Sequence, residues 1–309
     1  MQKQKTESRI AVYYELTKPK IWYLLVFTAF GAALTASNIY NIELSLSTWA
    51  LMLFSVAAGS AAANTLTNYH DRDIDAIMER TKNRPLPSKR IYPAVKGRNF
   101  GLVLAGISLV LAFAISFTTT LEQGAWATAF IAFGLLNNVL VYSYALKRNS
   151  RTNIILGGLC GGSPPMIGWV AVSMSDLWTM GLAMAGLVFI WIPMHIWALT
   201  LHFKDDYNKV NVPMLTAVQS EKTSARAIAG STVVMVLFSI APFFITTENG
   251  DSMVGGVYLW TAIASGLLMV GLSIWVIAKP MEKASWTLFK FSSPYLAVLF
   301  IALMVDSAL

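Results

Sequence analysis

Residues 64–87 read NTLTNYHDRDIDAIMERTKNRPLP and lie where a long apolar run turns into a charged loop. The apolar run at about 48–67 is long enough to cross a hydrocarbon core of roughly 30 Å as a helix. Carboxamide and carboxylate side chains recur at helical spacing in the segment, and basic residues and two prolines follow them. The segment therefore predicts a membrane-spanning helix that carries polar groups to one face of the membrane.

The whole chain shares this apolar character. Of its 309 residues, 56% are apolar and 13% are charged, and this charged share is about half that of an ordinary soluble domain. Such a composition excludes a disordered or fibrous chain. The single cysteine, Cys160, excludes intrachain disulfides and metal sites built from cysteines. We expect one integral membrane domain over residues 1–309, with no cleavable signal sequence before the first apolar run.

Nine segments are apolar and long enough to span a bilayer, and they lack the alternating polarity of a membrane barrel. Helices are then the structure that satisfies their backbone in lipid. The segments lie at about 21–37, 48–67, 100–118, 125–146, 153–173, 178–201, 228–246, 255–278 and 291–308. The predicted fold class is an all-α membrane protein with a bundle of nine transmembrane helices.

The basic residues predict the orientation of this bundle. The net charge of +7 comes from 23 Lys and Arg against 16 Asp and Glu. Every Lys and Arg lies in the N-terminal segment or in a loop that follows the second, fourth, sixth or eighth span. The positive-inside rule then places the N-terminus and these loops inside and the C-terminus outside. The positive charge is explained by the membrane and does not indicate a nucleic-acid partner.

A first polar cluster follows the second span. Asn64, Asn68, Asp71 and Asp75 fall within about 60° of one another on a helix, whereas Asp73 points to the opposite side. Oxygen ligands of this kind suit Mg²⁺, which binds one or two carboxylates together with substrate phosphates. The following basic residues could hold the other diphosphate oxygens; they are Arg72, Arg80, Lys82 and Arg84. The alternative is a solvated, salt-bridged loop that only fixes topology.

A second cluster ends the sixth span, on the same predicted side. His195, His202, Asp206 and Lys209 share one face if the helix continues past residue 204. Asp205 points about 100° away, so Asp206 is the better candidate ligand. Ionisable groups inside spans usually face a cavity or a partner, which makes His195 a candidate substrate contact. The alternative for both histidines is a structural role.

A third group ends the fourth span with Tyr142, Tyr144, Lys147 and Arg148. Tyrosines at this depth are also typical of the aromatic belt of a membrane protein. The glycines and prolines of the next span predict close helix packing or a helix break beside a cavity; they are Gly157, Gly158, Gly161, Gly162, Pro164 and Pro165.

Three segments resemble the UbiA superfamily of intramembrane prenyltransferases. NYHDRDIDAIMERTKNRPLP matches the superfamily broadly, while NIILGGLCGGSPPMIGW and HIWALTLHFKDDYNKVNVPML are similar to its haem O synthase branch, the protoheme IX farnesyltransferases. Many superfamily members have Asn-Asp where this chain has Thr67 and Asn68. Many also repeat an aspartate four residues after the second-motif Asp205 and Asp206, where this chain has Lys209 and Val210.

The resemblance implies transfer of a farnesyl group from farnesyl diphosphate to a vinyl group of haem B, which is a substrate and not a cofactor. It implies Mg²⁺ at Asn68, Asp71, Asp75, Asp205 and Asp206, with Asp71, Asp75 and Asp206 as catalytic residues. It adds Lys147, Arg148 and Lys204 to the cations that bind diphosphate, and it makes His195 and His202 candidate haem contacts. The implied setting is a bacterial plasma membrane, with the active site facing the cytoplasm and a downstream haem-modifying membrane enzyme as a partner.

Two other functions remain open from the sequence. A sister prenyltransferase would use an aromatic quinone precursor in place of haem. A transporter or channel would need polar groups at several depths in the membrane, whereas the two acidic clusters here lie at one face.

Overall fold

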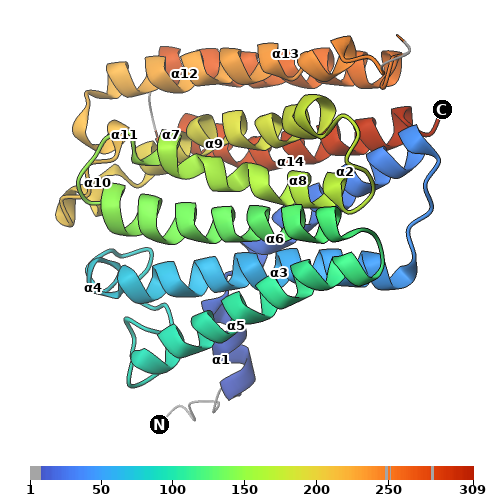
Figure 1. Ribbon diagram of the computed structural model, residues 1–309. Helices are drawn as coiled ribbons and strands as arrows, with labels where there is room; N and C mark the ends of the chain where they lie inside the picture. Colours follow the sequence, from blue (N-terminus) through green and yellow to red (C-terminus); the bar gives the residue numbers. More distant parts are fainter. Residues whose placement is uncertain (1–7, 248–249, 251, 280–281) are drawn as a thin grey trace.

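The computed structural model describes residues 8–247, 250, 252–279 and 282–309. Eight helical segments of this described part are long and apolar enough to cross a membrane, and they lie side by side in Figure 1. They are α2 (Pro19–Tyr40), α3 (Leu46–His70), α5 (Val95–Ala114), α6 (Leu121–Leu136) with its π-helical continuation Asn137–Leu146, α9 (Leu182–His202) with the preceding turn Leu177–Gly181, α12 (Glu221–Phe238), α13 (Gly256–Ala278) and α14 (Glu282–Asp306). The predicted all-α membrane fold is confirmed.

The fifth predicted span is helical but broken. It consists of α7 (Asn153–Gly157), a 3₁₀ segment Gly158–Gly162 and α8 (Ser163–Val170). Its glycines permit close packing, because a Cβ atom on Gly157 would lie 2.6 Å from Tyr142 Cβ, and one on Gly168 would lie 2.0 Å from the Ala29 carbonyl oxygen. Both the predicted break and the predicted close packing are present, while the count of nine spans stays a prediction.

Gly168→Ala should destabilise the protein by about 1–3 kcal/mol or more, because the added methyl group would overlap the backbone of α2. The measurement is thermal unfolding in detergent micelles. Gly106→Ala is the matched control, since nothing lies within 4 Å of a Cβ atom at that position of α5. Equal melting temperatures for the two variants would show that α2 and α8 do not approach as closely as the structure has them.

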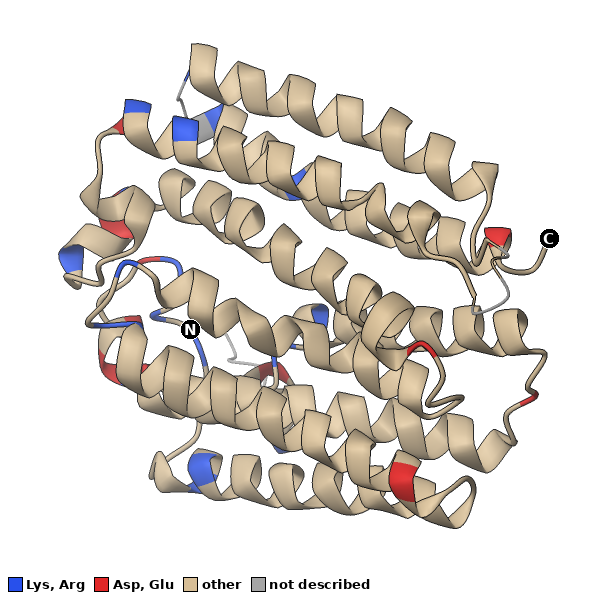
Figure 2. Ribbon diagram, turned by 45° about the horizontal axis from the view of Figure 1, so that its top comes forward, with Lys and Arg blue, Asp and Glu red and all other residues tan. Residues whose placement is uncertain are grey.

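The loops that follow α3 and α9 lie at the same end of the bundle. Figure 1 shows α4 (Arg72–Asp75), α10 (Lys204–Lys209) and α11 (Leu215–Val218) together there. Along the bundle, α3 packs against α5, α2 against α8, and α14 against α9 and α13. In Figure 2 the Lys and Arg residues gather toward this end, and only acidic residues mark the opposite end. The predicted segregation of charge is therefore present; which end faces the cell interior stays a prediction.

The N-terminal helix α1 (Arg9–Leu16) helps to close this end. Val12 and Leu16 form a small buried cluster with Leu86 and Ile91, from the loop between α4 and α5. The cluster fixes that loop beside the end of α3. The loop has no helix after Ala76 until Val95, in agreement with the helix-stopping role predicted for its prolines.

Candidate active site

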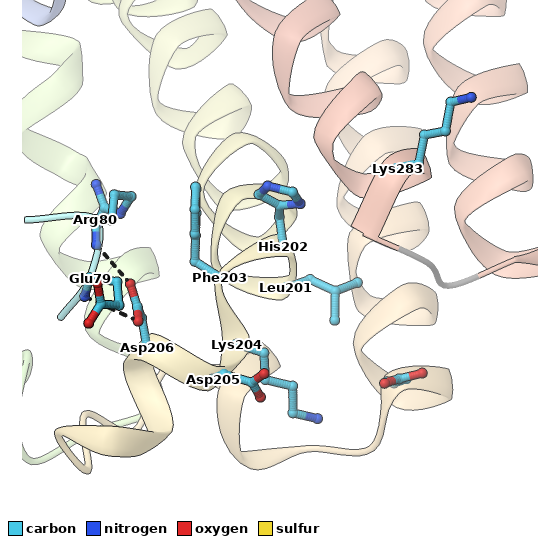
Figure 3. Close-up of a pocket in the computed structure, with 10 residues that line it drawn as sticks. Glu79, Arg80, Leu201, His202, Phe203, Lys204, Asp205, Asp206 and Lys283 are labelled. Carbon is cyan, nitrogen blue, oxygen red and sulfur yellow. Dashed lines mark hydrogen bonds between the residues drawn. The ribbon is translucent and has the colours of Figure 1, made fainter.

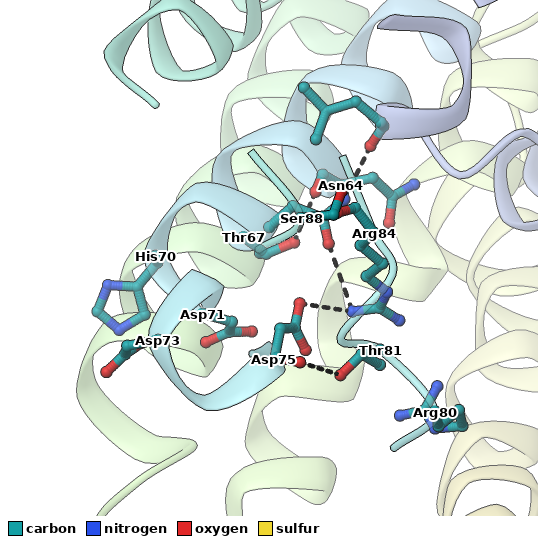
Figure 4. Close-up of polar contacts among 12 residues, drawn as sticks. Asn64, Thr67, His70, Asp71, Asp73, Asp75, Arg80, Thr81, Arg84 and Ser88 are labelled. Carbon is teal, nitrogen blue, oxygen red and sulfur yellow. Dashed lines mark hydrogen bonds and ion pairs between the residues drawn. The ribbon is translucent and has the colours of Figure 1, made fainter. Parts of the chain in front are cut away.

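Three polar side chains are buried where α3 ends. Asn68, Asp71 and Asp75 are 2%, 4% and 3% exposed. Helical hydrogen bonding continues from α3 into α4, because the Asp71 N–H donates to the Thr67 carbonyl at 2.9 Å and the Asp75 N–H donates to the Asp71 carbonyl at 2.8 Å. The three residues therefore share one buried face, as their spacing predicts, and Figure 4 shows Asp71 and Asp75 next to each other.

Two basic side chains neutralise this cluster. Arg84 donates from one guanidinium nitrogen to Asp75 at 2.8 Å and to the Asn68 side-chain oxygen at 3.5 Å. Lys147, just beyond the continuation of α6, forms an ion pair with Asp71. The Asn68 amide also donates to the Leu16 carbonyl at 2.8 Å, so α1 contributes to the site.

Asp71 has one oxygen that these contacts do not satisfy. Its Oδ1 atom is buried and has no hydrogen-bond partner among the described residues; the nearest guanidinium nitrogen of Arg148 lies 4.0 Å away. Burial alone would lower the pKa of Lys147, but the nearby Tyr142 and Asp71 raise it above its ordinary value. Lys147 therefore keeps its positive charge at neutral pH.

Asp73 lies outside this cluster, as its opposite position on the helix predicts. Its side chain is 61% exposed and accepts two hydrogen bonds of 2.7 Å from Arg148. These bonds lower the pKa of Asp73 to about 2. Arg148 also donates to the His70 carbonyl at 3.1 Å, so it joins the end of α3 to the end of the fourth span.

Lys18 is an ionisable neighbour of the site that was not among the predicted site residues. It precedes Pro19 and has a left-handed backbone with φ of 54°. Burial lowers the pKa of Lys18 well below its ordinary value, and Arg84 lowers it further, while Asp75 and Asp71 act in the opposite direction. No local sequence signal marks Lys18 as a site residue, because it is brought near Asp75 and Asp71 by tertiary packing.

Asp206, the strongest candidate of the second cluster, holds a backbone loop. Its carboxylate accepts the N–H groups of Glu79 at 3.3 Å and Arg80 at 3.1 Å, and Lys209 lies 3.5 Å away. Burial alone would raise the pKa of Asp206. The hydrogen bonds from Arg80, Glu79 and Lys209 lower it by more, so the pKa lies below its ordinary value. Its neighbour Asp205 is exposed. Asp206 thus ties α10 to the loop that follows the first cluster.

The second cluster does not share one helical face. That arrangement required a continuous helix, but α9 ends at His202 and Phe203 separates it from α10. Within the described ranges, no group of three or more His, Cys, Asp or Glu side chains could hold a metal ion. Asn68 adds a carboxamide oxygen to the carboxylates of Asp71 and Asp75, and these three buried residues form the candidate metal set that the structure brings together.

Other predicted site residues surround the cluster without entering it. Two of them lie against aromatic rings: the Arg72 guanidinium is 4.4 Å from the Tyr69 ring centre, and that of Arg80 is 5.3 Å from the Phe203 ring centre. The other two have polar partners. Lys82 pairs with Glu79 at 2.5 Å, and Lys204 donates to the Gln219 carbonyl at 2.8 Å. The Tyr142 ring lies 5.8 Å from the Lys147 ammonium nitrogen, whereas Tyr144 is exposed. Of the predicted diphosphate ligands, Arg84 and Lys147 hydrogen-bond to the buried cluster, and Arg148 approaches Asp71 to 4.0 Å.

Asp206→Ala should loosen the loop at residues 79–81, because two backbone N–H groups lose their acceptor at a cost of about 1–3 kcal/mol each if they stay buried. Hydrogen exchange of the Glu79 and Arg80 amides should become faster. Asp205→Ala is the matched control, since that side chain is exposed. Unchanged exchange in Asp206→Ala would remove the positioning role.

The two candidate haem-contacting histidines belong to one aromatic stack, defined by Trp191, His195, Phe289, Trp286 and His202. Successive ring centroids are 4.1, 4.4, 5.0 and 4.6 Å apart, and the interplanar angles are 26°, 29°, 15° and 19°. His195 lies inside the stack and its Nδ1 atom is 2.6 Å from the Ser292 hydroxyl. The stack joins α9 to α14, and His202 forms its end near α10.

An apolar cavity of about 100 Å³ begins one helical turn before Asn68. Asn64, Asn138 and Cys160 contribute polar atoms to its lining, which is otherwise mostly apolar. Asn138 donates to the Cys160 sulfur at 3.4 Å. The cavity lies between α2, α3, α6 and the broken fifth span, so it extends from the buried cluster into the membrane region.

Comparison with known proteins agrees with this fold. Residues 24–302 match the UbiA prenyltransferase family. The chain is 75% identical over 309 residues to "Protoheme IX farnesyltransferase 2" of Cenarchaeum symbiosum, covering 100% of this chain and 99% of that protein. It is 41% identical over 301 residues to "Protoheme IX farnesyltransferase" of Thermoplasma volcanium, covering 96% and 98% of the two chains.

Solved structures share the fold at low sequence identity. A digeranylgeranylglyceryl phosphate synthase matches with a TM-score of 0.73 and 19% identity over 97% of this chain and 98% of its own. A UbiA homologue from Archaeoglobus fulgidus bound to DMAPP and Mg²⁺ matches with a TM-score of 0.56 and 12% identity over 93% and 98%. This chain is therefore a multi-pass membrane prenyltransferase that belongs to the UbiA prenyltransferase family.

Proposed function

We propose that residues 1–309 form one prenyltransferase domain that transfers the farnesyl group of farnesyl diphosphate to a vinyl group of haem B, giving haem O and diphosphate. The observation that carries this proposal is the full-length, 75% identity to a protein named protoheme IX farnesyltransferase 2. The buried carboxylates with their paired cations support it, because departure of diphosphate requires concentrated counter-charge at the site.

Asn68, Asp71 and Asp75 fit a magnesium ion. Hard cations prefer oxygen ligands, and the buried Asp71 Oδ1 atom without a hydrogen-bond partner is an acceptor that a cation would satisfy. Bound Mg²⁺ would neutralise charge on the leaving diphosphate. Asp206 and Asp205 remain further candidate ligands. In the present structure the Asp206 carboxylate accepts hydrogen bonds from the backbone of the 79–81 loop.

Arg84 and Lys147 have two successive partners in this proposal. Without substrate they neutralise Asp75 and Asp71. With the diphosphate in place, they would turn from the carboxylates to phosphate oxygens, where charge-assisted hydrogen bonds are strong. Arg148 stays on Asp73, while Arg72, Arg80, Lys82 and Lys204 form an outer positive rim around the opening.

The chain's part in the bond changes is to orient the reactants and exclude water. The C1–O bond of farnesyl diphosphate breaks, and the electron pair leaves with diphosphate. The terminal vinyl carbon bonds to C1, a water oxygen adds to the adjacent vinyl carbon, and one proton is lost. The cavity beside Asn64 and Asn138 takes the part of the farnesyl chain nearest the diphosphate. Its apolar walls keep water from the allylic cation before the vinyl group attacks.

The site is proposed to face the cytoplasm, following the positive-inside rule for the loops that form it. The similarity to the protein of Cenarchaeum symbiosum favours an archaeal cell membrane over the bacterial one expected from the sequence. Haem O would then pass to a haem-modifying enzyme in the same membrane.

Mass spectrometry of haem extracted after expression in cells that lack haem O tests the proposal. We expect a new haem whose mass exceeds that of haem B by one farnesyl group plus one hydroxyl group, which is the mass of farnesol. Incubation of purified protein with farnesyl diphosphate and an aromatic quinone precursor serves as the acceptor control and should give no product. Prenylation of the quinone precursor with haem B left unchanged would assign the sister activity instead.

A further inference from the structure

A second cavity, of about 920 Å³, opens at the same end of the bundle. Its walls come from the loop after α4, the end of α9, α10, and the first turns of α12 and α14; Figure 3 shows Arg80, His202, Phe203 and Lys283 around it. Its volume lies within the range of small-molecule and cofactor sites, roughly 300–1,000 Å³. A space of this size, beside the catalytic loop and outside the metal cluster, has room for a second substrate.

We propose that this cavity is the docking site of the porphyrin acceptor. The macrocycle would lie against the aromatic end of α9 and the propionates would lie among the cations of the rim. The inference rests on the proposed function for the identity of the acceptor. It assigns the acceptor to a cavity beside the buried cluster of Asn68, Asp71 and Asp75, none of which lines it.

The aromatic stack provides a flat wall. His202 lines the cavity, and its ring is stacked on Trp286 at 4.6 Å and 19°. Phe203, also in the lining, meets the His202 ring edge-on at 4.5 Å. Planar aromatic surfaces favour offset stacking on one another, and a porphyrin presents a large planar face. His202 enters this proposal as a ring surface, and no bond to the iron is required.

Three cations from three elements line the opening: Arg80, Lys204 and Lys283. Two of the acidic lining residues are already paired with cations outside the lining, because Glu79 pairs with Lys82 and Asp206 lies 3.5 Å from Lys209. The cations therefore outnumber the remaining acidic residues, Asp205 and Glu221. Such a rim suits a ligand with two carboxylates at one edge.

The cavity and the metal cluster share the loop at residues 79–81. On one side, Asp206 in the cavity wall accepts the Glu79 and Arg80 N–H groups. On the other side, the Thr81 hydroxyl donates to the Asp75 carbonyl at 3.0 Å, and Figure 4 shows Thr81 next to Asp75, with Arg80 farther along the loop. A porphyrin in the cavity would thus have one edge at the wall that borders the farnesyl diphosphate.

His195 is a positioning residue in this arrangement. It lies between the Trp191 and Phe289 rings and is hydrogen-bonded to Ser292. The rings of Phe289 and Trp286 separate it from His202. Its effect on the acceptor is transmitted through the orientation of Phe289 and Trp286.

Binding of zinc protoporphyrin IX to the purified full chain in detergent, without farnesyl diphosphate, tests the cavity. We expect Lys283→Glu and Trp286→Ala each to weaken binding about tenfold.

Lys96→Glu and Trp178→Ala are the matched controls, and both should bind porphyrin as the wild type does. Lys96 is exposed on α5, and Trp178 packs in a separate cluster with Trp126 and Phe130. The dimethyl ester of the porphyrin should bind more weakly than the acid and be insensitive to Lys283→Glu.

Equal porphyrin affinity of Lys283→Glu, Trp286→Ala and the wild type would overturn the assignment. Loss of bound phosphatidylglycerol from Lys283→Glu, with porphyrin affinity unchanged, would assign the cavity to lipid headgroups and also overturn it. Haem O formation by the wild type is measured separately. If the wild type forms haem O and both variants bind porphyrin normally, the proposed function stands and the assignment of the cavity is wrong. If both variants lose porphyrin binding but the wild type forms no haem O, the assignment of the cavity is supported and the proposed reaction is contradicted.

Discussion

Asp71→Asn lowers farnesyl transfer by at least about a hundredfold while the protein stays inserted and folded. The substitution keeps the size of the side chain but removes the negative charge that Lys147 and the proposed metal ion share. Loss of one preorganised electrostatic partner at a reacting centre costs about 10²–10³ in rate. The measurement is turnover of farnesyl diphosphate and haem B by protein of verified melting temperature, with chelation by EDTA expected to stop the wild type in the same way.

Asp73→Asn is the matched control for this prediction. It changes the same atoms two residues along the chain, but Asp73 is 61% exposed and paired with Arg148 outside the cluster. Exposed ion pairs contribute about 0–1 kcal/mol, so this variant should keep most of its turnover. Wild-type turnover in Asp71→Asn would contradict the metal assignment, and equal losses in both variants would place the effect in the loop rather than in the cluster.

The sequence predicted the fold because its signals are local. Apolar runs of membrane length set the helices, and the basic residues gather toward one end of the bundle. Not all of them lie in loops as predicted, because α14 begins at Glu282 and so includes Lys290. The buried face of Asn68, Asp71 and Asp75 was also predictable, because it depends on helical spacing within one segment. Even the broken fifth span had a local signal in its glycines and prolines.

The contacts of the site depended on tertiary packing and could not be predicted in the same way. Lys147 and Asp71 are 76 residues apart, and their ion pair requires the fourth span to end beside α3. The break at Phe203 was invisible because the residues on both sides favour helix; it turns Asp206 toward the backbone of residues 79 and 80. The aromatic stack joins α9 to α14, and no spacing within α9 predicts that His195 lies between Trp191 and Phe289.

Lys147→Met should have two opposite effects, and together they test the exchange of partners proposed for this side chain. In the substrate-free protein Lys147 forms an ion pair with Asp71, so its ammonium group competes with a metal cation for that carboxylate. Its removal should tighten binding of Mn²⁺ alone by about tenfold, which is about 1.4 kcal/mol and well within the Coulomb energy of a partly buried pair. The same substitution should lower turnover by about a hundredfold, because the diphosphate loses a charged donor.

Electron paramagnetic resonance of free Mn²⁺ measures the first effect without any turnover. In the wild type, inorganic diphosphate should tighten Mn²⁺ binding strongly, because Lys147 and Arg84 leave the carboxylates for the phosphate oxygens; in Lys147→Met this enhancement should shrink. Arg148→Met is the matched control, since Arg148 pairs with the exposed Asp73 and lies 4.0 Å from Asp71. If Lys147→Met binds Mn²⁺ alone no better than Arg148→Met does, Lys147 does not compete with the cation. Its ion pair with Asp71 would then be a fixed part of the fold, and the diphosphate would have to be held by Arg84 and the outer rim.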